Sequence, residues 1–278
     1  MGAPPPSHRS LLFVPGSRPE RFDKALAAGA SAVIIDLEDA VAPADKPAAR
    51  AALQAWLLAP ARGDRAVVVR INSADTPWFD DDLALCGLPG VAAVMVPKAE
   101  RAAVLARVVA AGARALLPLV ESAAGLGALA ALAAAPGVWR LAFGSIDLQV
   151  DLGMKDATED ELLPFRLQLL LASRLAGIGA PIDGVSTTID DEPRLVQDVQ
   201  RARRLGFGGK LCIHPRQVAV VNRHLAPSDD ERAWAQRVLA AAAAAGGAGG
   251  AAIAVDGKMV DKPVLLRAEA ILREAAGG

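Results

Sequence analysis

Two acidic side chains stand just beyond apolar runs in the middle of the chain. Glu121 directly follows the run ALLPLV, and Asp147 comes four residues after the run LAF. Carboxylates that converge repel one another and raise each other's pKa, so such a pair needs a compensating cation. Because no histidine or cysteine is close by in the sequence, the ligands would all be oxygens, which favours Mg²⁺ over zinc. The pattern therefore predicts a magnesium site with Glu121 and Asp147 as its protein ligands.

Polar residues also follow most of the other apolar runs. They include PGSR (15–18), DLED (36–39), RIN (70–72), PK (97–98) and HP (214–215). If the runs are strands of one barrel, their ends converge on a single rim, which is where barrel enzymes carry out their chemistry. Before Asp147, Gly144 would let the backbone turn, and the amides of Gly144 and Ser145 could hold a substrate carboxylate.

A structural role is also open for each of these residues. Glu121 could cap the helix that follows it, and Asp147 could cap the turn in which it stands. Arg70, at the end of the third run, could form an ion pair with Asp36 or Glu38 as part of the barrel framework. The sequence by itself leaves both interpretations open.

Eight short apolar runs, each followed by a helical pattern, must position these groups. The runs cover residues 10–14, 32–37, 66–71, 91–96, 115–120, 141–143, 182–186 and 210–213. Continuous apolar runs are typical of parallel strands that are covered on both faces. Strand and helix alternating eight times predicts an α/β fold, a (β/α)₈ TIM barrel. An open doubly wound sheet is the alternative, although it usually has fewer strands and a nucleotide loop after the first.

The barrel is expected to end before the chain does. We expect a catalytic domain over residues 9–220 and a C-terminal extension over 221–278. The extension contains a helical stretch, the glycine-rich break GGAGG, a short AAIAVDGKMVDKP segment and a last helix. We expect it to form a helical lid on its own barrel, or to pack on or swap to a neighbouring subunit.

Composition narrows the classes of partner. The 30 Lys and Arg residues nearly balance 31 Asp and Glu residues without a long block of one sign, so nucleic acid is not an expected partner. No segment has the roughly 18 uncharged apolar residues of a membrane span, and MGAPPPSHRS lacks the apolar stretch of a signal peptide. The two cysteines stand in apolar surroundings, as core residues of a reduced protein would. We therefore expect a soluble cytoplasmic protein.

Eight segments together resemble the citrate lyase beta-subunit-like group of the HpcH/HpaI aldolase superfamily, which includes malyl-CoA and citramalyl-CoA lyases. In chain order they are RSLLFVPGSRPERFDKA, IIDLEDAVAPADKPAAR, VVRIN, VPKAE, PLVESAAGL, LAFGSIDLQVDLGM, CIHPRQV and VDGKMVDKPVLLRA. The resemblance runs from about Arg9 to Glu274, which is almost the whole chain. Each segment is weak evidence alone, but eight in this order are specific for the family.

The resemblance implies a Mg²⁺-dependent barrel that acts on acyl-CoA thioesters. Such an enzyme cleaves or forms the bond between an acetyl-type thioester and an oxo acid, as in malyl-CoA, citramalyl-CoA or citryl-CoA. By this likeness Glu121 and Asp147 are the metal ligands, and Arg70 binds substrate near the metal. Arg70 is also expected to be catalytic, because its positive charge can stabilise an enolate oxygen. Asp261, in MVDKP, matches an acidic residue that a neighbouring subunit brings to the active site. The resemblance thus also implies a homo-oligomer, a trimer or another multiple.

The same likeness assigns Arg9, Arg18 and Lys46 to the coenzyme A part of the substrate. Glu121, together with the Gly144 and Ser145 turn, is also expected to contact the substrate. Two other functions remain open. One is a metal-dependent aldolase of the same superfamily that acts on free pyruvate-derived hydroxy acids. The other is a barrel that is not catalytic by itself, or a beta subunit that works only within a multi-subunit lyase complex.

Overall fold

The computed structural model describes residues 8–59, 67–245 and 253–276. The chain divides into two compact units, a barrel unit over His8–Asn222 and a C-terminal unit that starts at Arg223. None of the helices that the structure describes is long and apolar enough to cross a membrane.

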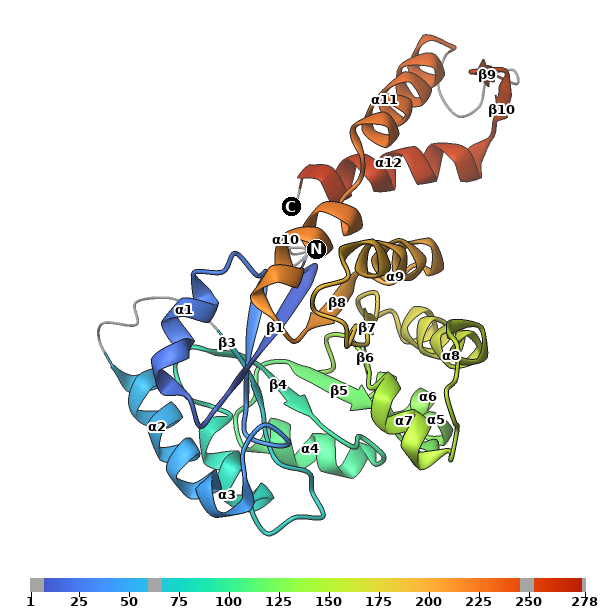
Figure 1. Ribbon diagram of the computed structural model, residues 1–278. Coiled ribbons are helices and arrows are strands. Elements are labelled where there is room, and N and C mark those ends of the chain that lie inside the picture. The colour runs from blue at the N-terminus through green and yellow to red at the C-terminus, as the bar shows by residue number, and fades with distance from the viewer. Residues whose placement is uncertain (1–7, 60–66, 246–252, 277–278) are drawn as a thin grey trace. The chain divides into compact units, whose positions relative to one another are not determined.

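The barrel unit is a closed barrel of eight parallel strands (Figure 1). The strands are β1 (Ser10–Pro15), β2 (Ala32–Asp36), β3 (Val67–Arg70), β4 (Val91–Val96), β5 (Leu116–Val120), β6 (Ala142–Phe143), β7 (Ile182–Asp183) and β8 (Gly209–Cys212). Each strand pairs with the next along the chain, and β8 closes the ring by pairing with β1. The expected TIM barrel is confirmed, and the open doubly wound sheet is excluded.

Helices follow the strands around the barrel. They are α1 (Phe22–Leu26), α2 (Lys46–Leu58), α3 (Phe79–Asp82), α4 (Ala102–Ala110), α5 (Ala123–Gly127), α6 (Leu129–Ala133), α7 (Ser145–Asp151), α8 (Glu159–Ala176), α9 (Glu192–Leu205) and α10 (Pro215–Leu225). Local sequence sets their ends. Helix α8 begins at a capping box formed by Thr158 and Glu161, and it ends at Gly177, whose φ of +69° suits glycine.

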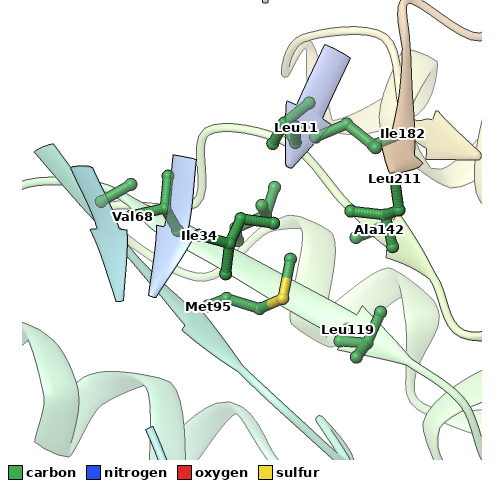
Figure 2. Close-up of a cluster of buried hydrophobic side chains, with 10 residues drawn as sticks. Leu11, Ile34, Val68, Met95, Leu119, Ala142, Ile182 and Leu211 are labelled. Carbon is green, nitrogen blue, oxygen red and sulfur yellow. The ribbon is translucent and has the colours of Figure 1, made fainter. Parts of the chain in front are cut away.

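One hydrophobic cluster receives side chains from all eight strands (Figure 2). Its buried members are Leu11, Ile34, Val68, Ala93, Met95, Leu117, Leu119, Ala142, Ile182 and Leu211. Burying one such aliphatic side chain contributes about 1.5–3 kcal/mol. Because strand side chains alternate in direction, a residue two positions further along points the same way. The ends of β2, β3 and β5 therefore direct Asp36, Arg70 and Glu121 toward the barrel axis at its C-terminal mouth.

The C-terminal unit has a small core of its own. It consists of α11 (Asp229–Ala244), a hairpin of β9 (Ile253–Val255) and β10 (Lys258–Val260), and α12 (Lys262–Ala276). Asp256 and Gly257, both with positive φ, form the two-residue turn that such hairpins favour. The buried members of its hydrophobic cluster are Ala235, Val238, Val260, Ala268 and Ile271.

Candidate active site at the barrel mouth

Glu121 lies just beyond β5 and is 4% exposed. Its Oε1 accepts a hydrogen bond from the backbone N–H of Lys98 at 2.7 Å. Its Oε2 is buried and has no hydrogen-bond partner among the residues that the structure describes. The side chain of Ser122 caps α5 by accepting from the N–H of Gly125, so Glu121 is not needed for that capping role. A buried carboxylate oxygen without a partner suits the binding of a cation.

Asp147 lies in the first turn of α7, exposed at the same mouth. Burial raises the pKa of Glu121 to about 8, and the nearby negative charges of Glu38 and Asp147 add to the rise. The Lys98 N–H and the charge of Arg70 act in the opposite direction. The charge of Asp147 thus acts on the carboxyl group of Glu121.

The donor set fits a hard divalent cation. In the described ranges, no group of three or more His, Cys, Asp or Glu side chains could hold a metal ion together. Two carboxylates would leave most coordination positions to water and substrate oxygens, which is the usual arrangement of protein-bound Mg²⁺. The unpartnered Oε2 of Glu121 would provide one of the two protein ligands.

Arg70 ends β3 and is held by three carboxylates. Asp36 binds it in a two-pronged ion pair, with Nε to Oδ1 at 2.7 Å and Nη2 to Oδ2 at 2.6 Å. Nη1 lies 3.0 Å from Oε2 of Glu38 and 3.3 Å from Oδ2 of Asp39. The guanidinium also stacks over the ring of Phe13, 5.0 Å from its centroid. Arg70 therefore has the structural role that its sequence position left open, as an ion-pair partner of the acids at and after the end of β2.

Glu38 was considered from the sequence as a possible partner of Arg70 but was not assigned to the site. Burial raises the pKa of Glu38 to about 8, and the charges of Arg70 and Lys98 oppose this rise. The signal in the sequence was its position, because Glu38 stands two residues beyond Asp36. The backbone N–H of Glu38 donates to Oδ1 of Asp36 at 2.9 Å, which fixes the turn after β2.

Glycines let two other strand ends approach closely. A Cβ on Gly144 would lie 2.6 Å from Oε2 of Glu121, so Glu121 packs directly against this backbone. A Cβ on Gly184 would lie 2.5 Å from Oγ of Ser145, which is buried against the end of β7. Gly144 and Ser145 thus lie at the mouth, beside Glu121.

The ammonium group of Lys46 is buried and hydrogen-bonded within the barrel unit. Its side chain is 6% exposed, and its Nζ donates to the carbonyls of Leu37 and Glu38, both at 2.9 Å, and to Oδ1 of Asn72 at 2.6 Å. An ammonium group has three N–H donors, and these acceptors use all of them. In this geometry Lys46 fixes the loop after β2 and is not available to a phosphate of coenzyme A.

The two arginines assigned to coenzyme A lie far apart. Arg18 follows β1 and is exposed on the mouth side, where its Nε pairs with Glu20 at 2.6 Å. Arg9 precedes β1, a strand of six residues that spans about 20 Å. Because parallel strands run toward the mouth, Arg9 lies at the opposite end of the barrel. The structure does not bring Arg9 to the rim.

Asp261 belongs to the C-terminal unit. It stands exposed at the start of α12, where its Oδ1 accepts a hydrogen bond from the N–H of Val264 at 3.1 Å. This contact makes Asp261 the N-cap of the helix.

A closed barrel of eight parallel strands with buried charged groups at its C-terminal mouth defines an enzyme of the TIM-barrel class. The sequence profile of the HpcH/HpaI aldolase/citrate lyase family matches residues 9–215, and the chain belongs to this family. It is 38% identical over 288 residues to a citrate lyase subunit beta-like protein of Deinococcus radiodurans, covering 99% of this chain and 100% of that protein.

Two further comparisons bear on the site. A (3S)-malyl-CoA thioesterase of Cereibacter sphaeroides is 36% identical over 274 residues, covering 96% of this chain and 94% of that protein. The crystal structure of CitE from Mycobacterium tuberculosis in complex with magnesium, acetoacetate and coenzyme A superimposes with a TM-score of 0.83 at 40% identity. It covers 97% of this chain and 98% of that one. The likeness extends through the C-terminal unit as well as the barrel.

Proposed function

We propose that this chain is a Mg²⁺-dependent carbon–carbon lyase that acts on a 3-hydroxyacyl-CoA thioester. Its products would be an acetyl-type thioester and an oxo acid, and malyl-CoA, citramalyl-CoA and citryl-CoA are the candidate substrates. The observation that carries the proposal is the buried, unpartnered Oε2 of Glu121 at the barrel mouth, on whose carboxyl group the charge of Asp147 acts. The homologous CitE complex with magnesium and coenzyme A supports the choice of cation and substrate class.

The roles of the residues follow from their chemistry. Glu121 and Asp147 would hold Mg²⁺, which when bound supplies Lewis-acid activation of the substrate oxygens. The amides of Gly144 and Ser145 would orient the substrate carboxylate. Arg70 would contribute positive charge to the site, within the limits set by its three carboxylate partners. Arg18, exposed on the mouth side, would meet a phosphate of coenzyme A.

Cleavage also needs a group that moves a proton. Breaking the bond leaves an enolate, and an acid must protonate its carbon. We assign this role to Asp261, brought to the site from a neighbouring subunit, which makes the active form a homo-oligomer. In the synthetic direction the same carboxylate would act as the base.

The test uses the purified chain with malyl-CoA, citramalyl-CoA and citryl-CoA, each in Mg²⁺ and in EDTA. We expect one of them to give an oxo acid and an acetyl-type thioester only when Mg²⁺ is present. Glu121→Ala and Asp147→Ala should abolish this turnover while circular dichroism stays unchanged. Should Asp147→Ala unfold the protein, its carboxylate is structural; a lack of turnover on all three thioesters would contradict the proposal.

Hydrolysis of the thioester is a second candidate, because a relative at 36% identity is named a malyl-CoA thioesterase. A thioesterase releases free coenzyme A, whose thiol a disulfide reagent detects at once. A lyase releases an acyl-CoA, which carries no free thiol. Measuring the thiol and the oxo acid in one reaction therefore separates the two activities.

A further inference from the structure

Lys98, directly after β4 and Pro97, has an unusual backbone conformation. Its φ is +44°, and in the described ranges the other non-glycine residues with positive φ are two aspartates, Asp156 and Asp256. Aspartate and asparagine tolerate this left-handed region, whereas for a long side chain it costs about 1–2 kcal/mol. Strain of this kind persists where the surrounding structure or the function requires it.

A hydrogen bond of the Lys98 backbone accounts for the conformation, but it does not account for a lysine at this position. Its N–H donates to Oε1 of Glu121 at 2.7 Å and so leaves Oε2 facing the site. A glycine would supply the same N–H without the steric cost. The presence of lysine therefore calls for a role of the side chain.

The Lys98 side chain is exposed, and its ammonium takes part in no ion pair or hydrogen bond with the residues that the structure describes. Its charge nevertheless acts on the site. Burial raises the pKa of Glu38, and the charges of Arg70 and Lys98 counter that effect. The charge of Lys98 therefore reaches the carboxylates around Arg70, in addition to Asp75.

Two other cations of the site, Arg70 and Lys46, are already engaged. Arg70 faces Asp36, Glu38 and Asp39, and the ammonium of Lys46 has three acceptors. A cation that is already neutralised offers less stabilisation to a new negative charge than one that is not. Lys98 differs from both in this respect.

We propose that the ammonium of Lys98 binds the thioester oxygen of the substrate and stabilises the negative charge that forms there. This inference rests on the proposed lyase function. In the step concerned the carbon–carbon bond breaks, and its electron pair passes to the thioester, whose carbonyl becomes an enolate. The carbon that carried the hydroxyl becomes the carbonyl of the oxo acid. The hydroxyl proton passes through an acid–base group and ends on the α-carbon of the acetyl-type thioester.

Three variants separate charge from backbone strain. Lys98→Gly removes the ammonium and relieves the strain, Lys98→Ala removes the ammonium and keeps the strain, and Lys98→Arg keeps the charge. The matched control is Arg101→Ala. A hydrogen bond from Ser73 lowers the pKa of Asp75, and the charges of Lys98 and Arg101 both add to that decrease. Arg101 is therefore a neighbouring exposed cation that shares one target with Lys98.

We expect kcat of Lys98→Gly and Lys98→Ala to fall on the order of 100-fold, the usual loss when a stabiliser of a developing anion is removed. Lys98→Arg should recover part of this loss, and Arg101→Ala should keep the wild-type kcat. Calorimetric Mg²⁺ affinity should be unchanged in Lys98→Gly, because the N–H to Glu121 remains. Its melting temperature should equal or exceed that of Lys98→Ala.

The inference is overturned if Lys98→Gly keeps wild-type kcat, or if its Mg²⁺ affinity falls as much as its turnover. A second readout does not need cleavage: exchange of the acetyl-CoA methyl protons with deuterium in D₂O also passes through the enolate. A wild-type chain that cleaves no thioester contradicts the proposed function. If the wild type cleaves no thioester, the exchange rates still test Lys98. Equal rates in the wild type and in Lys98→Gly, or no exchange in either, overturn the role of Lys98.

Discussion

A Cβ atom on Gly144 would lie 2.4 Å from Cβ of Glu121. The end of β6 therefore has no room for any side chain at this position, because the side chain of Glu121 fills it. The contact joins the ends of β5 and β6. From the other neighbouring strand, β4, the N–H of Lys98 donates to Oε1 of Glu121 at 2.7 Å. Glu121 is thus fixed by the backbone of both neighbouring strand ends.

This packing makes Gly144→Ala a direct test of Glu121. The added methyl group should displace the carboxylate and weaken Mg²⁺ binding by about 10–100-fold, the range seen when a group that orients a metal ligand is lost. Titration calorimetry measures the affinity. Gly127→Ala in α5 is the matched control, because a Cβ there has no neighbour within 4 Å. Equal Mg²⁺ affinity in the two variants would contradict the proposed ligand role of Glu121.

The ion pair between Asp36 and Arg70 predicts that Asp36 and Asp39, three residues apart, contribute very differently to the free energy of unfolding. Asp36→Asn removes one partner of a buried ion pair, and we expect the free energy of unfolding to fall by about 3 kcal/mol or more. Asp39→Asn removes a carboxylate that is 68% exposed, and we expect a change below about 1 kcal/mol. Urea unfolding of both variants measures the difference. Similar losses would mean that the two-pronged contact does not hold Arg70.

Glu38 predicts a specific dependence of stability on pH. Burial raises the pKa of Glu38 from 4.5 to about 8, so its stabilising contribution is complete below the unfolded-state pKa and is lost as the pH rises to 8. Between pH 5 and 8 the wild type should therefore lose stability on the order of a few kcal/mol. Glu38→Gln has no proton to lose and should show a flatter profile in EDTA. Asp39→Asn removes one of the charges that add to this rise, so it should change the profile less than Glu38→Gln does, because burial is the largest cause.

The strands and the convergence of the acids could be read from the sequence for a simple reason. Barrel strands are covered on both faces, so their sequences are continuous apolar runs. All eight predicted runs contain strands in the structure. The rule that chemistry lies at the carboxyl ends then selected Glu121 and Asp147. The same rule could have excluded Arg9, which stands before the first run and not after it.

The partners of long side chains and the residues with unusual backbone angles could not be predicted from the sequence pattern. Lys46 bonds to Asn72, 26 residues further along the chain, and only the folded barrel brings the two together. The pairing of Arg70 with Asp36 or Glu38 was open for the same reason. Lys98 adopts φ of +44° without the glycine or asparagine that usually marks such a position. Each depends on tertiary contacts that the local sequence does not encode.

Substitutions of Arg18 and Lys46 should affect different properties, KM for the thioester at Arg18 and the stability of the fold at Lys46. Lys46→Met leaves two buried carbonyls and an amide oxygen without their donor, so it should destabilise the fold by about 2 kcal/mol or more. Arg18→Ala should leave stability within about 0.5 kcal/mol of wild type and raise KM for the thioester, more strongly at low salt. Arg21→Ala is the control for Arg18, because both side chains are about half exposed beside Glu20. Equal KM values in these two arginine variants would contradict a phosphate contact at Arg18.

Asp261 has two roles to separate, the cap of α12 and the proposed proton transfer in a neighbouring site. Asn caps a helix about as well as Asp, but it cannot exchange a proton at neutral pH. Asp261→Asn should therefore keep the wild-type melting temperature and lose turnover, whereas Asp261→Ala should lose both, with about 1 kcal/mol of stability. Mixing Asp261→Asn subunits with Glu121→Gln subunits should restore part of the activity, because some sites in the hybrids receive an intact residue from each chain. Full activity of Asp261→Asn alone would leave Asp261 with the capping role only, and its inactivity without recovery on mixing would place the carboxylate in its own barrel's site.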